Sequence, residues 1–202
     1  MKLFTRAAVT VLIASTLALV GCTAEPAQSQ TSADDGPAAA KAHCEDTGGT
    51  VQTRQPTFNT NASDKSQWEP LGDPVELCGY STLDDGTEIF VDLVTISSER
   101  PTLAALAYLA KPQVPDVPGN PATALCEQIG GAVGWGAGAQ SGGLVLDDDD
   151  FEIIAPCTFA DGSFIEEWGI AYYSDDTVRG KDLTEVFQFD QDDLPEVDFD
   201  TE

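Results

Sequence analysis

Basic residues are scarce in this chain, and histidine occurs once. Of 202 residues, 9 are Lys or Arg and 35 are Asp or Glu, so the formal net charge is -26 at pH 7. Phosphate backbones and anionic lipids are bound through clustered Lys and Arg, and the few here are scattered, so no nucleic acid partner is expected. A field of this sign attracts cations and basic proteins. Adaptation to a salty habitat, where ionic strength screens repulsion, is the other explanation.

Long apolar runs are lacking beyond the N-terminus. Lys2 and Arg6 precede the run Ala7 to Val20, which is too short for a stable membrane span and is typical of a secretion signal. It ends in Leu19-Val20-Gly21-Cys22, which resembles the bacterial lipoprotein signal. The resemblance implies a signal peptide at 1–21, acyl chains such as palmitate on Cys22, and attachment to the membrane through this lipid anchor. The alternative is an ordinary cleaved signal with Cys22 near the cut.

Residues 22–36 are rich in Ala, Ser, Gln and Asp, and we expect a lipidated flexible tether there. Thr23 stands where the resemblance to enterobacterial lipoproteins would place an aspartate for inner-membrane retention. The expected location is therefore the bacterial cell envelope, on an outer membrane facing the periplasm if the cell is Gram-negative.

The other four cysteines are expected outside the cytosol, where disulfides persist. Cys44, Cys78, Cys126 and Cys157 allow three connectivities. An internal repeat favours Cys44–Cys78 and Cys126–Cys157, each closing a loop of roughly 30 residues and stabilising the fold by about 3 to 4 kcal/mol. A zinc site is the competing interpretation, but neither pair has C-x₂₋₄-C spacing and the only histidine, His43, lies beside one cysteine.

The repeat is read from two aligned segments. Cys44-Glu45-Asp46-Thr47-Gly48-Gly49-Thr50-Val51 aligns with Cys126-Glu127-Gln128-Ile129-Gly130-Gly131-Ala132-Val133, so both read C-E-x-x-G-G-x-V, and an Asp-Gly pair follows the second cysteine of each copy. This self-similarity predicts a tandem duplication. The predicted fold class is α+β: two tandem small modules, each a short helix packed on a three-stranded antiparallel sheet with one disulfide.

Local signals place the elements of each copy. The sequence predicts a helix over 121–129, with a counterpart over 37–47. The signals for the first of these are Asn120 as N-cap, Pro121 at the first helical position and the glycine pair at the end. Variable loops are expected at 52–74 and 134–150, and Asp-Gly predicts hairpins whose second strands run to residues 96 and 173. We expect a first module at 37–113, a second at 114–182 and an acidic C-terminal tail at 183–202.

The second copy carries a longer motif. It runs from Asn120-Pro121-Ala122 through Cys126 and Gly130-Gly131 to Cys157-Thr158-Phe159-Ala160-Asp161-Gly162-Ser163-Phe164-Ile165-Glu166-Glu167-Trp168. It resembles a family of small bacterial secreted proteins and lipoproteins with N-P-A, C-x-x-x-G-G and C-x-F-x-D-G-S-x-C-E-E-W, often labelled hemolysins, whose domain has no known function. The resemblance covers 120–173 well and 37–96 weakly. Ile165 replaces a cysteine of the family pattern, so the family's disulfide arrangement is not carried over.

Groups suited to catalysis or metal binding are few. His43 is the only imidazole, and no G-x-S-x-G motif occurs. On a strand, Glu166 and Glu167 would point to opposite faces and form no catalytic pair, and Trp168 is expected in the core. Weak cation binding is possible at Asp147, Asp148, Asp149 and Asp150, which lack the spaced calcium pattern and are typical of a solvated loop. We expect no catalytic residue, metal or cofactor.

These patterns together predict a non-enzymatic bacterial cell-envelope lipoprotein, with a binding or structural role and a protein partner in the envelope. An envelope inhibitor of a secreted hydrolase, such as a protease or lysozyme, is the alternative. The hemolysin label taken literally is a third interpretation, but no amphipathic basic helix supports membrane lysis.

Overall fold

The computed structural model describes residues 35–83, 86–134, 142–146, 152–174, 177–192 and 194. They belong to the second of two compact units, Ser32–Glu202, and nothing further is described of the first, Met1–Thr31. The predicted signal peptide, Cys22 and the aspartates Asp147 to Asp150 lie outside the described residues. Within the described ranges, no helix combines the length and apolar character needed to cross a bilayer.

The described part is mixed α+β, which confirms the predicted class. Its helices are α1 (Asp35–Asp46), α2 (Leu93–Ser97), α3 (Leu103–Leu109), α4 (Pro121–Gln128) and α5 (Glu167–Ala171), with 3-10 helices η1 (Lys65–Gln67) and η3 (Leu183–Glu185). Its strands are β1 (Thr50–Phe58), β2 (Glu69–Pro70), β3 (Val75–Ser81), β4 (Glu88–Asp92), β5 (Ala132–Val133), β6 (Gly143–Val145), β7 (Ile153–Ile154), β8 (Pro156–Thr158), β9 (Phe164–Glu166), β10 (Tyr173–Ser174) and β11 (Thr177–Val178).

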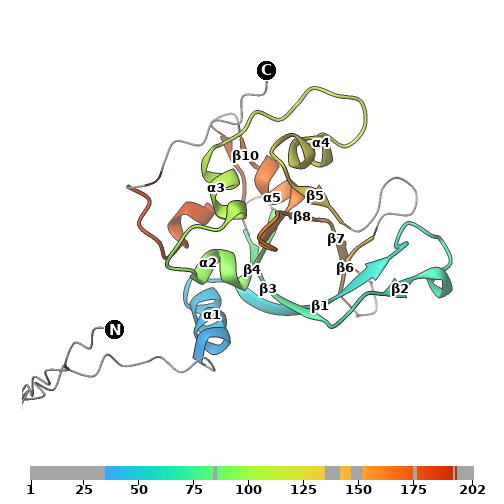
Figure 1. Cartoon of the computed structure of the whole chain (residues 1–202), viewed down its shortest axis with the longest axis horizontal. Coiled ribbons are helices and arrows are strands. Elements are labelled where there is room, and N and C mark those ends of the chain that lie inside the picture. Colours follow the sequence, from blue (N-terminus) through green and yellow to red (C-terminus); the bar gives the residue numbers. More distant parts are fainter. Residues whose placement is uncertain are drawn as a thin grey trace, which may run out of the picture. The chain divides into compact units, whose positions relative to one another are not determined.

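One antiparallel sheet runs through both halves of the repeat. Its strand order is β5-β8-β9-β4-β3-β1-β6-β7, with β2 paired to β1, and Figure 1 shows how it curls. The halves join where Val91 of β4 pairs with Ile165 of β9, and again where β6 pairs with β1. The structure therefore differs from the expectation of one separate three-stranded sheet per half. Joining the edge strands satisfies their backbone groups and pools two small cores.

A single row of paired residues crosses six strands. From either end of the row toward its middle, the residues are a valine, a cysteine and then a β-branched residue. Each residue of the row pairs with the next one on the neighbouring strand. In order, they are Val133 of β5, Cys157 of β8, Ile165 of β9, Val91 of β4, Cys78 of β3 and Val51 of β1. Each cysteine of the row is bonded to the helix of its own half, as Cys44–Cys78 from α1 to β3 and Cys126–Cys157 from α4 to β8. This is the pairing that the repeat favoured.

The glycine pairs after α1 and α4 have two distinct roles. The first glycine of each pair, Gly48 or Gly130, has a φ of 89° or 85°, which suits the residue that follows a helix. The second, Gly49 or Gly131, packs against the disulfide of its half so closely that a Cβ there would overlap a cysteine Sγ. The C-x-x-x-G-G spacing thus specifies a helix end and the room for a bridge beside it.

The sheet separates two hydrophobic clusters. Leu77, Phe90 and Phe164 point to one face with Leu144 and Ile154, whereas their sequence neighbours on the strands point to the opposite face, as strand alternation requires. The second face carries the larger cluster, in which the helices take part. Because both faces are covered, strand register in the central sheet is tightly determined.

The chain after residue 182 belongs to the larger cluster. Leu183, Val186, Phe187 and Phe189 are buried, with exposed fractions of 0%, 2%, 8% and 5%. The expected acidic tail from residue 183 therefore does not describe 183–189, which form part of the core. Residues 195–202, the most acidic end of the chain, lie outside the described residues.

Candidate functional site

An apolar groove of about 810 Å³ lies between α1 and α2, and a volume of this size is typical of ligand sites. Its lining comes from α1, β3, the end of β4, α2 and the two residues after it, the turn before β9, the start of β9, and the C-terminal segment. The lining residues are Gly36, Pro37, Ala39, Ala40, Val75, Glu76, Asp92, Leu93, Val94, Ser97, Ser98, Glu99, Gly162, Phe164 and Gln188. We take this groove as the candidate site, and call it the α1–α2 groove.

The α1 wall is built from small side chains on a covalently held helix. Ala40 and Cys44 are the side chains of α1 in the core, and the Cys44–Cys78 bridge ties the helix to β3. Lys41 Nζ also forms an ion pair with Glu76 Oε1 at 2.6 Å. The exposed Ala39 has only a methyl group, so an incoming chain can approach the helix closely.

The α2 wall begins where β4 ends. Asp92 Oδ1 accepts the Thr95 N–H at 2.9 Å, and this N-cap turns the chain from strand into helix. The second hairpin strand was expected to run to residue 96, and the structure corrects it to end at Asp92. Val94, on the first turn of α2, has 62% of its surface exposed at the groove.

Asp92 is a buried carboxylate with its oxygens fully engaged. Oδ2 accepts the Thr95 hydroxyl at 2.6 Å and the Phe164 N–H at 2.7 Å. Burial raises the pKa of Asp92, and the hydrogen bonds from Thr95 and Phe164 oppose that rise. Because every oxygen already accepts a hydrogen bond, Asp92 holds α2 and β9 together and is not poised for proton transfer.

The Asp-Gly-Ser turn of the second copy caps a helix of the first. Asp161 Oδ2 accepts the Leu103 N–H at 2.8 Å, and Ser163 Oγ accepts the Ala104 N–H at 3.0 Å, at the start of α3. Burial alone would raise the pKa of Asp161, but the hydrogen bonds from Leu103 and Ser163 outweigh it and hold that pKa below its usual value. These two motif residues therefore have a structural role between the two halves.

The two glutamates of the motif also serve structure. Glu166 Oε2 accepts the Gly169 N–H at 2.9 Å and begins α5, so the strand expected to run to residue 173 ends at Glu166. Glu167 accepts the Asn120 amide at 2.7 Å and the Thr123 hydroxyl at 2.6 Å, which ties α5 to α4. Trp168, expected in the core, has 38% of its surface exposed.

Glu166 is expected to make stability depend on pH. Burial raises its pKa from 4.5 to about 7, helped by the neighbouring charge of Glu167 and opposed by backbone hydrogen bonds. The folded protein thus keeps a proton that the unfolded chain releases above its lower pKa, so this contribution to stability falls as pH rises from about 4.5 through 7. We expect Glu166→Gln, which stays uncharged, to exceed the wild type in free energy of unfolding by about 3 kcal/mol at pH 8.

Urea unfolding followed by circular dichroism at pH 4.5 and pH 8 measures this difference. The gain should be small at pH 4.5, where Glu166 is protonated in the folded state. Glu127→Gln, on the exposed side of α4, is the matched control and should change little at either pH. Equal stability of Glu166→Gln and the wild type at pH 8 would contradict the expected effect.

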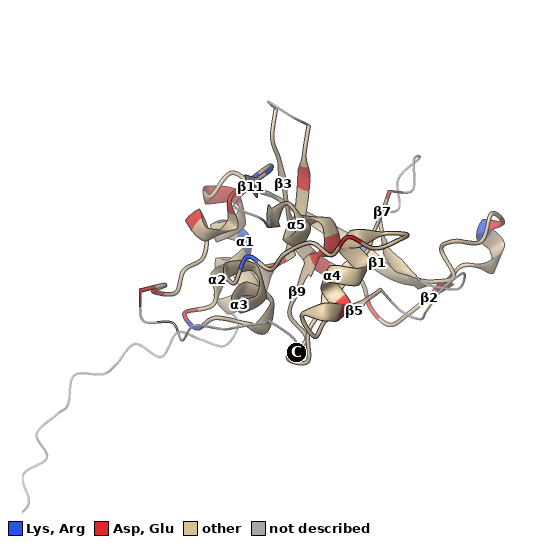
Figure 2. Cartoon of the chain, turned by 90° about the horizontal axis from the view of Figure 1, so that it is seen from above, with Lys and Arg blue, Asp and Glu red and all other residues tan. Residues whose placement is uncertain are grey.

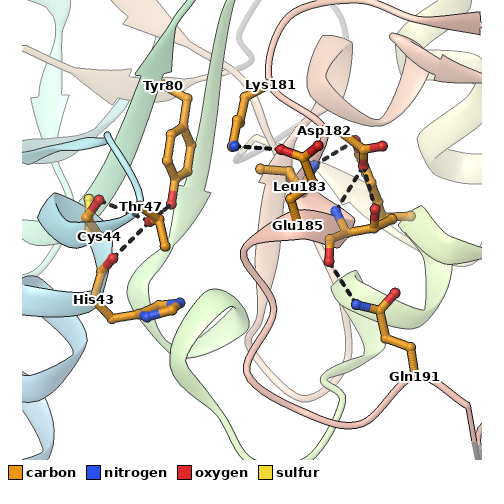
Figure 3. A network of polar contacts seen from close by, with 11 residues as sticks. His43, Cys44, Thr47, Tyr80, Lys181, Asp182, Leu183, Glu185 and Gln191 are labelled. Atoms are coloured by element: carbon orange, nitrogen blue, oxygen red, sulfur yellow. Dashed lines mark hydrogen bonds and ion pairs between the residues drawn. The ribbon is translucent and has the colours of Figure 1, made fainter.

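His43 holds the C-terminal segment. Its Nε2 donates to the Val186 carbonyl at 2.6 Å, and its Nδ1 accepts from the Gln188 amide at 3.0 Å. Figure 3 shows the neighbouring contacts, in which Thr47 Oγ1 bonds the His43 carbonyl at 2.7 Å and meets the Tyr80 hydroxyl at 2.8 Å. With both ring nitrogens engaged, His43 is a positioning residue of the fold.

The predicted site residues do not converge on the groove. The four cysteines are in two disulfides at separate helices, and within the described residues no group of three His, Cys, Asp or Glu side chains could hold a metal ion. The possible cation site at Asp147 to Asp150 lies outside the described residues. The groove itself was missed because α2 was expected to be strand; Asp92 followed three residues later by Thr95 was the available capping signal.

No protein-family model, curated protein or solved structure matches the chain.

Proposed function

We propose that the protein is a non-enzymatic lipoprotein of the bacterial cell envelope that acts by binding, and that the α1–α2 groove is its binding site. The groove is the observation that carries this proposal, because it combines a mainly apolar lining with a few polar groups. The engaged state of Asp92 and His43 supports a role without catalysis.

We also infer that the chain arose by duplication of one disulfide-bonded module. The order helix, strand, hairpin, helix occurs as α1-β1-β3-β4-α2 and again as α4-β5-β8-β9-α5. Asp92 and Glu166 occupy equivalent places in the two series, each capping the helix that ends its hairpin. The motif shared with the hemolysin-labelled family supports a relationship of the second copy to those modules.

Cys22→Ser is expected to release the protein from the membrane. Without the thiol, no acyl chain can attach, and each buried CH₂ of such a chain contributes about 0.8 kcal/mol to membrane binding. In cells fed with labelled palmitate, the wild type should carry label and sediment with membranes, whereas the variant should carry none. A variant that stays labelled and membrane-bound would refute the lipid anchor. Thr23→Ser is the matched control and should behave as the wild type.

The groove is tested by placing a photo-crosslinking residue, p-benzoylphenylalanine, at Val94 in cells that make the protein. Position 178 on β11 is the control, because Val178 is also an exposed valine, at 45%. Irradiation should give a discrete adduct from position 94 and none from position 178. No adduct at 94, or the same adduct at both, would contradict binding at the groove. A secreted protease or lysozyme in the adduct would favour the hydrolase-inhibitor alternative.

A further inference from the structure

The titratable residues in the lining of the α1–α2 groove are of one sign. Among the described residues that line it, Glu76, Asp92 and Glu99 are carboxylic acids, and none is Lys, Arg or His. Figure 2 shows that acidic positions outnumber basic ones over the described elements, as the composition requires. A ligand entering the groove therefore meets the negative field of the whole chain. Locally it meets Glu99, and Glu76 wherever a ligand cation replaces Lys41, whereas Asp92 is buried and engaged.

Much of the lining of the groove is apolar. Val75 and Phe164 contribute from the sheet, and Leu93 and Val94 from α2. Burying the exposed part of Val94 removes apolar surface from water, at about 25 cal/mol per Å². A ligand that covers this apolar lining must present apolar groups to it, so a simple cation does not match the site.

The acidic residues of the lining distinguish between anionic and cationic ligands that carry apolar groups. Fatty acids and anionic phospholipids carry carboxylate or phosphate groups, which would be placed beside Glu76 and Glu99 and repelled. The Lys41–Glu76 ion pair is weak, because both side chains are about 40% exposed (39% and 41%) and exposed ion pairs contribute at most about 1 kcal/mol. A Lys or Arg of a ligand can compete with Lys41 for Glu76.

We propose that the α1–α2 groove binds a basic, amphipathic segment of a protein partner, with the segment's apolar side chains on Val94 and Ala39 and its Lys or Arg side chains beside Glu99 and Glu76. This inference rests on the proposed function, since it names the partner chemistry of the same site. Helix-in-groove recognition uses such a division between an apolar face and a charged margin. Complementary charge would speed association and make it sensitive to salt.

The test uses the full chain in nanodiscs of zwitterionic phosphatidylcholine, which do not attract basic peptides by charge. Three fluorescent peptides share one apolar face and carry Lys, Gln or Glu at every polar position. In fluorescence anisotropy at low salt, the Lys peptide should bind about tenfold more tightly than the Gln peptide, the Glu peptide should bind least, and salt should narrow the difference. Nanodiscs without protein provide the baseline.

Two variants locate the binding. Val94→Arg puts a cation into the groove and should weaken the Lys peptide about tenfold, whereas Val178→Arg makes the same charge change on β11 and should weaken it less than about twofold. Circular dichroism verifies that both variants keep the wild-type fold, as expected for exposed positions. Glu99→Gln should weaken the Lys peptide and leave the Gln peptide unchanged.

The peptide measurements distinguish a failure of the basic-partner inference from a failure of the groove as a binding site. Equal loss in Val94→Arg and Val178→Arg would show attraction to the overall charge alone and would refute the inference. Binding of the Gln or Glu peptide, or of oleate, as tightly as the Lys peptide and with the same sensitivity to Val94→Arg would keep the groove as a binding site but refute a basic partner. No binding of any peptide would also refute the inference, while the crosslink from position 94 still decides the proposed function.

Discussion

Deletion of residues 183–202 is expected to prevent folding. Four buried apolar side chains are lost: Leu183, Val186, Phe187 and Phe189. At roughly 1.5 to 3 kcal/mol each, they account for about 6 kcal/mol or more, which is comparable to the whole net stability of many domains, about 5 to 15 kcal/mol. The C-terminal segment is thus as necessary to the core as the strands.

Polar contacts strengthen this expectation. The deletion leaves the buried Tyr108 hydroxyl without the Leu183 N–H that it accepts at 3.1 Å, and leaves His43 without the Val186 carbonyl at 2.6 Å. It also strips the Phe187 ring from the edge of Tyr108, where the ring centroids are 5.9 Å apart. A buried polar group that loses its partner costs about 1 to 3 kcal/mol.

Thermal unfolding followed by far-ultraviolet circular dichroism measures the effect of the deletion. Deleting only residues 195–202 is the control, because it keeps all four buried side chains and Leu194, which packs against the core. The control should unfold cooperatively near the wild-type midpoint, and the longer deletion should show no cooperative transition. A cooperative transition in both would mean that the segment 183–194 is not part of the stabilising core.

Arg54→Ala is expected to lower the free energy of unfolding by about 2 to 5 kcal/mol, the range found when a large buried side chain is cut back to alanine. Arg54 lies on β1 with no exposed surface. Its Nη2 contacts Glu152 Oε1 at 2.7 Å, its Nη1 donates to the Glu152 carbonyl at 3.2 Å, and its Nε donates to Gln52 at 2.9 Å. The guanidinium also lies 4.5 Å from the centre of the Phe90 ring.

The alanine variant leaves a cavity and removes the side chain that ties β1 to the residue before β7. Arg54→Met fills most of the space without the charge and should lose less than half as much, because Glu152 is 41% exposed and can return to water. Lys181→Ala, which breaks the more exposed Lys181–Glu185 pair, should change stability by less than about 1 kcal/mol. Equal midpoints in urea for Arg54→Ala and Lys181→Ala would contradict the role assigned to Arg54.

Local signals predicted several elements correctly. The N-cap Asn120, Pro121 and the glycine pair predicted a helix over 121–129, and α4 spans Pro121–Gln128. The repeated cysteine spacing favoured the two disulfides that the structure contains. These features succeed because they depend on residues near one another in the chain, or on covalent spacing that both copies share.

Other features could not be predicted from such signals. The candidate groove depends on α2, five residues for which the sequence predicts a strand, because an apolar run of that length suits either structure. The sequence predicts Asp161 as a turn residue and Ser163 as the first residue of the strand that follows. Their hydrogen-bond partners at the start of α3 are 58 and 59 residues away in the chain. Neither contact leaves a periodic pattern in the sequence.

By itself the sequence determined the acidic charge, the repeated C-E-x-x-G-G-x-V motif, the position of α4 and the α+β class. The tertiary structure alone decided that the halves share one sheet, that residues 183–189 enter the core, that Arg54 is buried, and that α1 and α2 enclose a groove. The physical reason is that capping, turn chemistry and composition act over a few residues. Pairing of strand edges and burial of side chains depend on segments that are far apart in the chain. Such segments come together when they satisfy each other's backbone hydrogen bonds and exclude water.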